Sequence, residues 1–287
     1  MVLSLIIMDE RRLVKSGSFS HTVALPKEWI TRHNLKKGSK VYVTDYQGGL
    51  LLLPEKAQHT THQKRDRILS VDGVLPSSIV RDITASYLTN STTIRLQGRE
   101  LRKQLALYKE TIARYPGLEV IEETGDYLLL KDFINIDELN VPDLVRRADI
   151  IIRSLFEDTR ECLLTASAEL AEAIRKRDKE VNRLAFLVYK CINYIAEHPQ
   201  EAKIHGIETR HLPNLWEVNS YLEKIGDEVK RFALIIPQDT LATKDKKIIE
   251  DIFKEVEQFY LTVMAALYKG QVEEADAISY HRNMLKK

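Results

Sequence analysis

The 287-residue sequence contains only two cysteines, Cys162 and Cys191. Two cysteines cannot build the disulfide framework of a small secreted domain, and these two lack the close spacing of metal-binding cysteines. Both fall on apolar positions of expected helices. We therefore expect both to be reduced core residues of a cytosolic protein.

Long apolar runs are also missing. No stretch approaches the roughly 20 apolar residues that span a bilayer, which predicts no membrane insertion and a cytoplasmic location. The apolar start, residues 1–8, lacks a basic segment and a small-residue cleavage site, so we expect no signal peptide.

Motifs that carry catalysis are scarce as well. The sequence has no Gly-rich phosphate loop and no nucleophile elbow. Its expected long helices lack the Glu-x-x-His pairs of di-iron carboxylate enzymes. We predict that the protein is not an enzyme.

The charge that is present is unevenly distributed. The whole chain has a formal net charge of +1, yet residues 1–65 carry 11 Lys and Arg against 5 Asp and Glu. A basic N-terminal module on a mildly acidic body indicates a polyanionic partner for the module.

That N-terminal module, residues 8–54, is expected to contain two short strands, a short helix opened by Pro26, and two further strands. Fewer than fifty residues bury too little apolar surface to be stable alone. The pattern therefore predicts a homodimer formed through this module.

The segment RRLVKSGSFSHTVALPKEWITRHNLKKGSKVYV, beginning at Arg11, resembles the swapped-hairpin DNA-binding domain shared by AbrB, SpoVT and MazE. The resemblance implies an AbrB-like DNA-binding and dimerisation domain over residues 1–58, with loops that face DNA. Basic side chains would neutralise phosphates, while hydroxyls and loop amides would fix the register. The positions carried over as the contact surface are Arg11, Arg12, Lys15, Ser16, Ser18, Ser20 and His21. The alternative is a polar edge in a module that only dimerises.

Residues 65–137 predict a small α/β connecting domain. Helices are expected over residues 79–88 and 99–114, and strands over residues 92–96, 118–121 and 127–130.

From residue 141 onward the sequence predicts a helical body, residues 141–287. An apolar stripe indicates a first helix from Pro142 to about Leu170. A second helix over residues 178–197 and a third over residues 213–236 complete an antiparallel three-helix bundle. A fourth helix ending at Gly270 and a fifth over residues 272–285 would form a shortened second bundle. The expected fold class is thus multidomain and mainly α, with a small β module in front.

Two polar pairs spaced i, i+4 stand out on the second and third helices. Asp178 and Asn182 form one pair, and Glu223 and Asp227 form the other. Residues four apart share a helix face, so two packed helices could direct four oxygen ligands at one hard cation. The alternative is an ordinary solvated helix face.

The passages RDKEVNRLAFLVYKCIN and NLWEVNSYLEKIGDEVKRFA resemble the PhoU family of phosphate-uptake regulators. The resemblance implies a tandem of three-helix bundles and a Glu/Asp-x-x-x-Asp repeat that holds iron, zinc or another divalent ion. Glu223 and Asp227 match the repeat, whereas Asn182 replaces its second carboxylate. A neutral amide oxygen lowers the ligand charge and hence the expected affinity.

Together the two resemblances imply a protein similar to archaeal phosphate-uptake regulators. We expect a DNA-binding regulator whose body senses a metal, phosphate status or a partner. That partner would be a phosphate ABC transporter ATPase or an associated signalling protein. The alternative is a dimeric adaptor without DNA function.

Overall fold

The computed structural model describes residues 10–46, 49–54, 65–238 and 243–270, and its chain is mostly helical, at 61%. It divides into two compact units, Met1–Gln63 and Lys64–Lys287, each treated by itself below. The mainly helical character expected from the sequence is confirmed, as are small sheets near the N-terminus.

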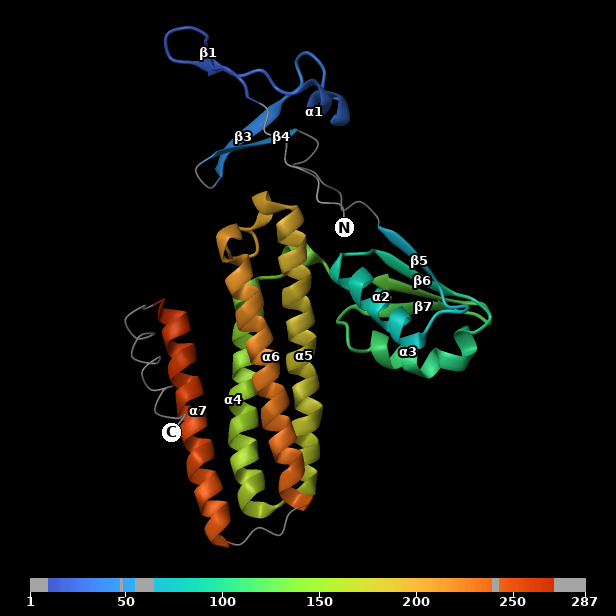
Figure 1. Ribbon diagram of the computed structural model, residues 1–287, viewed down its shortest axis with the longest axis vertical. Helices are drawn as coiled ribbons and strands as arrows, with labels where there is room; N and C mark the ends of the chain where they lie inside the picture. Colours follow the sequence, from blue (N-terminus) through green and yellow to red (C-terminus); the bar gives the residue numbers. More distant parts are fainter. Residues whose placement is uncertain (1–9, 47–48, 55–64, 239–242, 271–287) are drawn as a thin grey trace. The chain divides into compact units, whose positions relative to one another are not determined.

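Unit 1 contains two antiparallel hairpins separated by one short helix (Figure 1). Its first hairpin pairs Lys15 with His21, and its second pairs Val41 with Pro54. The order of strands and helix is the one expected from the sequence. The elements are β1 (Val14–Lys15), β2 (His21–Thr22), α1 (Lys27–Arg32), β3 (Val41–Tyr46) and β4 (Gly49–Pro54).

The described part of unit 1 has almost no interior. Apart from Pro54, none of its residues with described side chains is buried, and α1 buries none. Phe19 is fully exposed, while Leu13 and Leu50 are about 70% exposed, at 72% and 69%. This half-module exposes apolar side chains that a folded domain normally encloses.

Unit 2 begins with a four-stranded mixed sheet in the order β5-β6-β8-β7, in which only β5 and β6 run parallel. Helices α2 and α3 pack against this sheet (Figure 1). Buried Ile83, Tyr87, Leu96 and Leu130 lie in their common core. The elements are β5 (Asp66–Ser70), α2 (Pro76–Leu88), β6 (Thr93–Gln97), α3 (Leu105–Ile112), β7 (Leu118–Glu123) and β8 (Tyr127–Asp132).

Two sequence expectations for this α/β part were wrong. Strand β5 was not anticipated, because its five residues are mostly exposed and lack an alternating apolar pattern. The helix expected over residues 99–114 is instead a 3-10 turn, Leu101–Gln104, followed by the shorter α3. The turn allows buried Leu101 to enter the core before α3 begins.

Three long helices of unit 2 stand side by side, with a fourth beside α4 (Figure 1). They share one apolar core, which extends from Val141 in α4 to Met264 in the fourth helix. The helices are α4 (Val141–Thr165), α5 (Ala168–Glu197), α6 (Leu212–Ile235) and α7 (Thr243–Lys269). In the part of the chain that is described, no helix is long and apolar enough to span a membrane.

The boundary between α4 and α5 differs from the sequence expectation. The apolar stripe was expected to continue to Leu170, with a second helix starting near Asp178. Instead, Ala166 adopts a left-handed conformation with φ 53°, which ends α4. The Ser167 side chain accepts a hydrogen bond from the Leu170 amide and caps α5. Neither glycine nor proline marks this break, so its residues give little warning of it.

Helix α7 belongs to the same core as the first three helices. The Phe156 ring of α4 lies 5.3 Å from the Phe253 ring and 5.4 Å from the Tyr260 ring. Buried Asp149 accepts hydrogen bonds from the hydroxyls of Tyr260 and Tyr268. The helix expected over residues 272–285 lies outside the described residues, so the short second bundle stays a prediction.

Polar contacts join α5 to the α/β part. Buried Lys190 pairs with Asp132 at the end of β8 and donates to the Tyr87 carbonyl at 3.1 Å. The Asn193 amide donates to the Leu88 carbonyl at 3.1 Å. These contacts attach the sheet and its helices to the C-terminal half of α5.

Candidate functional site

The two polar pairs predicted from the sequence lie on facing helices, Asp178 and Asn182 on α5, Glu223 and Asp227 on α6. Gly226 permits the close approach, because a Cβ atom there would lie 3.3 Å from the Asp178 Oδ1 atom. Asp178 is only 2% exposed, whereas the other three side chains are partly buried.

A lysine on α6 lies between these carboxylates. Lys230 Nζ donates to Asp178 Oδ2 at 2.6 Å and also pairs with Asp227. The Asn182 amide donates to the same Asp178 oxygen at 3.4 Å. The sequence analysis missed Lys230, although its position three residues after Asp227 on a helix is the spacing of an intrahelical ion pair.

Negative charge in this cluster exceeds positive charge. Three carboxylates surround one ammonium group, and Glu223 has no hydrogen bond to Lys230 among the interactions given. Burial raises the pKa of Glu223 and the nearby Asp227 and Asp178 carboxylates raise it further. Burial likewise raises the pKa of Asp178, although Lys230 opposes that shift. The cluster therefore favours an additional proton or cation.

Two oxygens in the cluster lack hydrogen-bond partners. Asp178 Oδ1 and Asn182 Oδ1 are both buried and unsatisfied. A buried acceptor without a partner is costly, and a hard cation is one group that satisfies it. This observation fits one oxygen-coordinated ion held from α5.

The arrangement does not fit a multinuclear metal cluster. Asp178, Glu223 and Asp227 do not bring three carboxylate oxygens within 4.8 Å of one another. Lys230 already supplies a positive charge to two of them. An ion here would have to displace the lysine from Asp178 and draw Glu223 inward.

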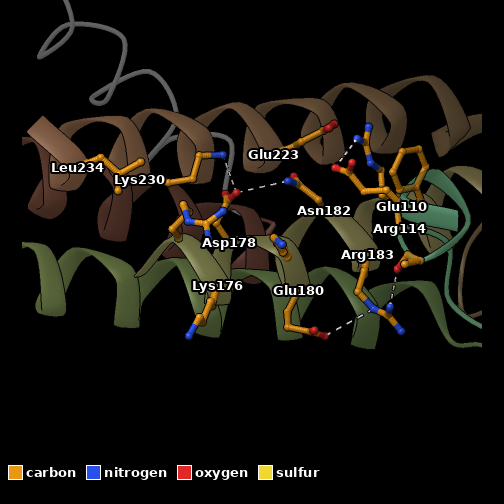
Figure 2. Close-up of a pocket in the computed structure, with 14 residues that line it drawn as sticks. Glu110, Arg114, Lys176, Asp178, Glu180, Asn182, Arg183, Glu223, Lys230 and Leu234 are labelled. Carbon is orange, nitrogen blue, oxygen red and sulfur yellow. Dashed lines mark hydrogen bonds and ion pairs between the residues drawn. The ribbon is translucent and has the colours of Figure 1, made fainter. Parts of the chain in front are cut away.

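The cluster opens into a cavity of about 630 Å³ between α5, α6 and the end of α3 (Figure 2). Its rim is more basic than acidic. Arg183 spans the cavity edge, donating to the Ala113 carbonyl at 2.9 Å. The six basic residues lining the cavity are Arg114, Arg175, Lys176, Lys179, Arg183 and Lys230.

The residues predicted to contact DNA are brought together in unit 1. Lys15 and His21 are directly opposite each other in the β1–β2 pair. The Ser16 amide donates to the Ser20 carbonyl at 2.8 Å, and the Ser20 hydroxyl donates back to the Ser16 carbonyl. Gly17, with φ 82°, permits this tight loop.

All seven predicted contact residues are exposed. Ser18 lies in the loop between β1 and β2, next to the exposed ring of Phe19, while Arg11 and Arg12 precede β1. One hairpin therefore presents basic, hydroxyl and backbone groups together. That arrangement can contact phosphates and could also dock against protein.

Fold and site together define a helical-bundle protein with an acidic cluster between two helices and a separate N-terminal β unit. The PhoU domain family model matches residues 145–236. Comparison with curated proteins and with solved structures gives no match. The matched stretch runs through α4, α5 and α6, so this part of the chain is PhoU-like and supports a role in phosphate signalling.

Proposed function

We propose that the protein is a phosphate-signalling regulator that binds DNA through unit 1 and senses a cation through its PhoU-like bundle. The observation that carries the proposal is the acidic cluster of Asp178, Asn182, Glu223, Asp227 and Lys230 within the matched PhoU region. A phosphate ABC transporter ATPase or an associated signalling protein is the proposed partner of the bundle.

The proposed cation site uses Lys230 as an internal competitor. Without a metal, the ammonium group neutralises Asp178; with a metal bound, the ion takes the unsatisfied oxygens of Asp178 and Asn182. Asp227 retains its lysine partner in either state. The ion would be divalent or ferric, because several hard oxygen ligands surround it.

Substitution of Lys230 tests this site. Lys230→Met should bind a divalent ion about tenfold more tightly than the wild type, because the competing charge is gone. Glu223→Gln and Asp227→Asn should lower the metal content of the purified protein. The matched control is Glu228→Gln, which changes an exposed carboxylate on α6 paired with Arg231. Equal metal content in all four variants would exclude the site.

The β1–β2 hairpin is the proposed DNA contact. Arg11, Arg12 and Lys15 lie within five residues of one another, beside the loop amides of residues 16–20. Changing all three to Ala should weaken binding to phosphate-transport promoter DNA. It should also reduce the slope of log K against log salt by about 2.7, because each lost phosphate contact contributes about 0.9.

A charge-matched control separates this contact from bulk electrostatics. Arg32, Lys36 and Lys37 are exposed basic residues elsewhere in unit 1, and changing them to Ala removes the same charge. We expect the control to retain most of the binding and the salt slope. Equal losses in both triple variants would remove the hairpin as the contact.

A second candidate function is an adaptor that dimerises without binding DNA. The exposed apolar side chains of unit 1, including Leu13 and Phe19, favour it because they suit a protein interface. In that case the protein would be dimeric and would bind promoter DNA weakly or not at all, with no dependence on salt. A gel-shift series between 50 and 200 mM salt distinguishes the two functions.

A further inference from the structure

A second group of metal-ligand side chains lies at the opposite end of α5. Asp137, Glu201 and His205 place one ligand atom each within 4.8 Å of the others. Asp137 belongs to a short 3-10 turn, Ile136–Glu138, that precedes α4, and Glu201 belongs to another, Pro199–Glu201, that follows α5. The group thus joins segments more than sixty residues apart.

The histidine of this group has one unsatisfied ring nitrogen. His205 is fully buried, and its Nδ1 atom lies 2.8 Å from the Leu139 carbonyl oxygen. A carbonyl only accepts hydrogen bonds, so Nδ1 carries the proton and Nε2 is left with its lone pair. Nε2 is buried and has no hydrogen-bond partner.

This environment is the one that proteins give to metal-binding histidines. Donation from one ring nitrogen to a backbone carbonyl fixes the tautomer and orients the other nitrogen towards the ion. The backbone adds a second restraint, because the His205 carbonyl accepts from the Val141 amide at 3.0 Å. Tyr194 similarly fixes Glu201 through a hydrogen bond from its hydroxyl.

We propose that Asp137, Glu201 and His205 bind one borderline divalent transition ion, with Zn²⁺ as its best representative. Imidazole nitrogen combined with two carboxylate oxygens suits zinc and its neighbours better than Mg²⁺ or Ca²⁺, which prefer oxygen ligands alone. Ligand atoms about 2 Å from a tetrahedral ion lie about 3.3 Å apart, so binding requires side-chain shifts of about an ångström.

Such an ion would connect the α/β part of unit 2 to its helical bundle. Asp137 lies on the segment that leaves β8, whereas Glu201 and His205 lie on the connection between α5 and α6. The site is chemically distinct from the all-oxygen cluster at Asp178, and the proposed function does not depend on it.

The test is Zn²⁺ titration of the full chain after removal of metals with a chelator, followed by isothermal titration calorimetry. All proteins carry Glu223→Gln and Asp227→Asn, so ions held between α5 and α6 do not contribute. We expect one Zn²⁺ per chain and a rise in Tm on its addition. Both Glu201→Gln and His205→Gln should weaken binding by about tenfold or more.

Glu201→Gln is the decisive variant, because the amide oxygen still accepts the Tyr194 hydroxyl and circular dichroism can verify the fold. Glu208→Gln is the matched control: it alters an exposed carboxylate in the same connection, paired with Arg210 at 2.9 Å. The control should bind Zn²⁺ like its parent. Absence of binding in the parent, or binding unaltered by Glu201→Gln, would overturn the proposal, since surface histidines would then account for any Zn²⁺ uptake.

Discussion

Lys190 is a charged side chain that unit 2 buries almost completely, at 2% exposed. Its ammonium group pairs with Asp132 and lies 4.2 Å from the centre of the Tyr87 ring. Burial lowers the pKa of Lys190, and the adjacent Asp132 carboxylate opposes that shift. The pair therefore depends on both partners being present.

Removing the lysine should strongly destabilise the protein. Lys190→Met leaves Asp132 buried without its counter-ion, which costs about 3–5 kcal/mol in the free energy of unfolding. Urea denaturation measures this change. Lys109→Met serves as the control, because its ion pair with Glu123 is exposed and should contribute less than about 1 kcal/mol. A loss below about 1 kcal/mol in Lys190→Met would contradict the assigned role.

The two cysteines should be inert in the folded protein. Both are fully buried, and burial raises the pKa of Cys191 to about 12. Because the thiolate is the reactive form, its fraction at pH 9 is only about 10⁻³. We expect Cys191 labelling by a thiol reagent to remain slow from pH 7 to pH 9 and to become rapid in denaturant. Fast native labelling that increases tenfold per pH unit would indicate an accessible thiol instead.

At the residue scale, helical spacing predicted which polar side chains would share a face, and Asp178 and Asn182 do hydrogen-bond to each other. Spacing within one helix could not show that Lys230 would reach across to Asp178, because this contact depends on how α5 and α6 pack. The Asp137, Glu201 and His205 group was inaccessible for the same reason, since no short motif links residues so distant in sequence.

At the element scale, the turn between α4 and α5 uses two residues with opposing effects. Ala166 pays a conformational cost at φ 53°, whereas Ser167 stabilises the start of α5. Ala166→Gly should raise the free energy of unfolding by about 0.5–1 kcal/mol, because glycine adopts this conformation freely. Ser167→Ala should lower it by about 1 kcal/mol through loss of the cap.

Chemical denaturation of both variants measures these changes, and the signs are the critical result. Ala166 is exposed, so the substitution to glycine removes no buried contact. A destabilised Ala166→Gly protein would mean that the left-handed turn does not form in solution.

Asp149 fastens α7 to α4. Its carboxylate accepts from Tyr260 at 2.7 Å, from Tyr268 at 2.9 Å and from Arg153 at 3.0 Å. Asp149→Leu leaves these donors without their acceptor, and we expect faster amide hydrogen exchange in α7 than in α5 or α6. Tyr268→Phe removes one hydrogen bond only, at a cost of about 1 kcal/mol, and should leave α7 largely protected.

The helices themselves were predictable to different degrees. Helix α6 and the fourth helix follow unbroken apolar periodicity, so their positions agreed with expectation within a few residues. The division between α4 and α5 was not, because the apolar stripe continues through Ala166 and Leu170 while the backbone reverses direction. Periodicity reports which face is buried and is insensitive to a two-residue turn.

At the scale of the whole molecule, the two units differ in how far they can be stable alone. Residues Lys64–Lys287 contain two apolar cores, one in the α/β part and one in the bundle. Unit 1 has no comparable core among its described residues. The sequence predicted this weakness from length alone, although the partner that would complete unit 1 is still an inference.

We expect the full chain to be a dimer and a fragment of residues 64–287 to be a folded monomer. Sedimentation velocity gives the mass of each species, and circular dichroism verifies that the fragment retains its helices. Unit 1 supplies the association because its exposed apolar side chains need a second copy. A monomeric full chain, or a dimeric fragment, would place association elsewhere.

Helix α5 is 30 residues long, which corresponds to a rod of about 45 Å. Near its first third it carries Asp178, and twelve residues later it carries Lys190, which is anchored in the α/β part. Between these points the backbone has no interruption. A small roll of the rod about its long axis, imposed where Asp178 exchanges one positive neighbour for another, would therefore also shift the anchorage of the sheet about 18 Å away.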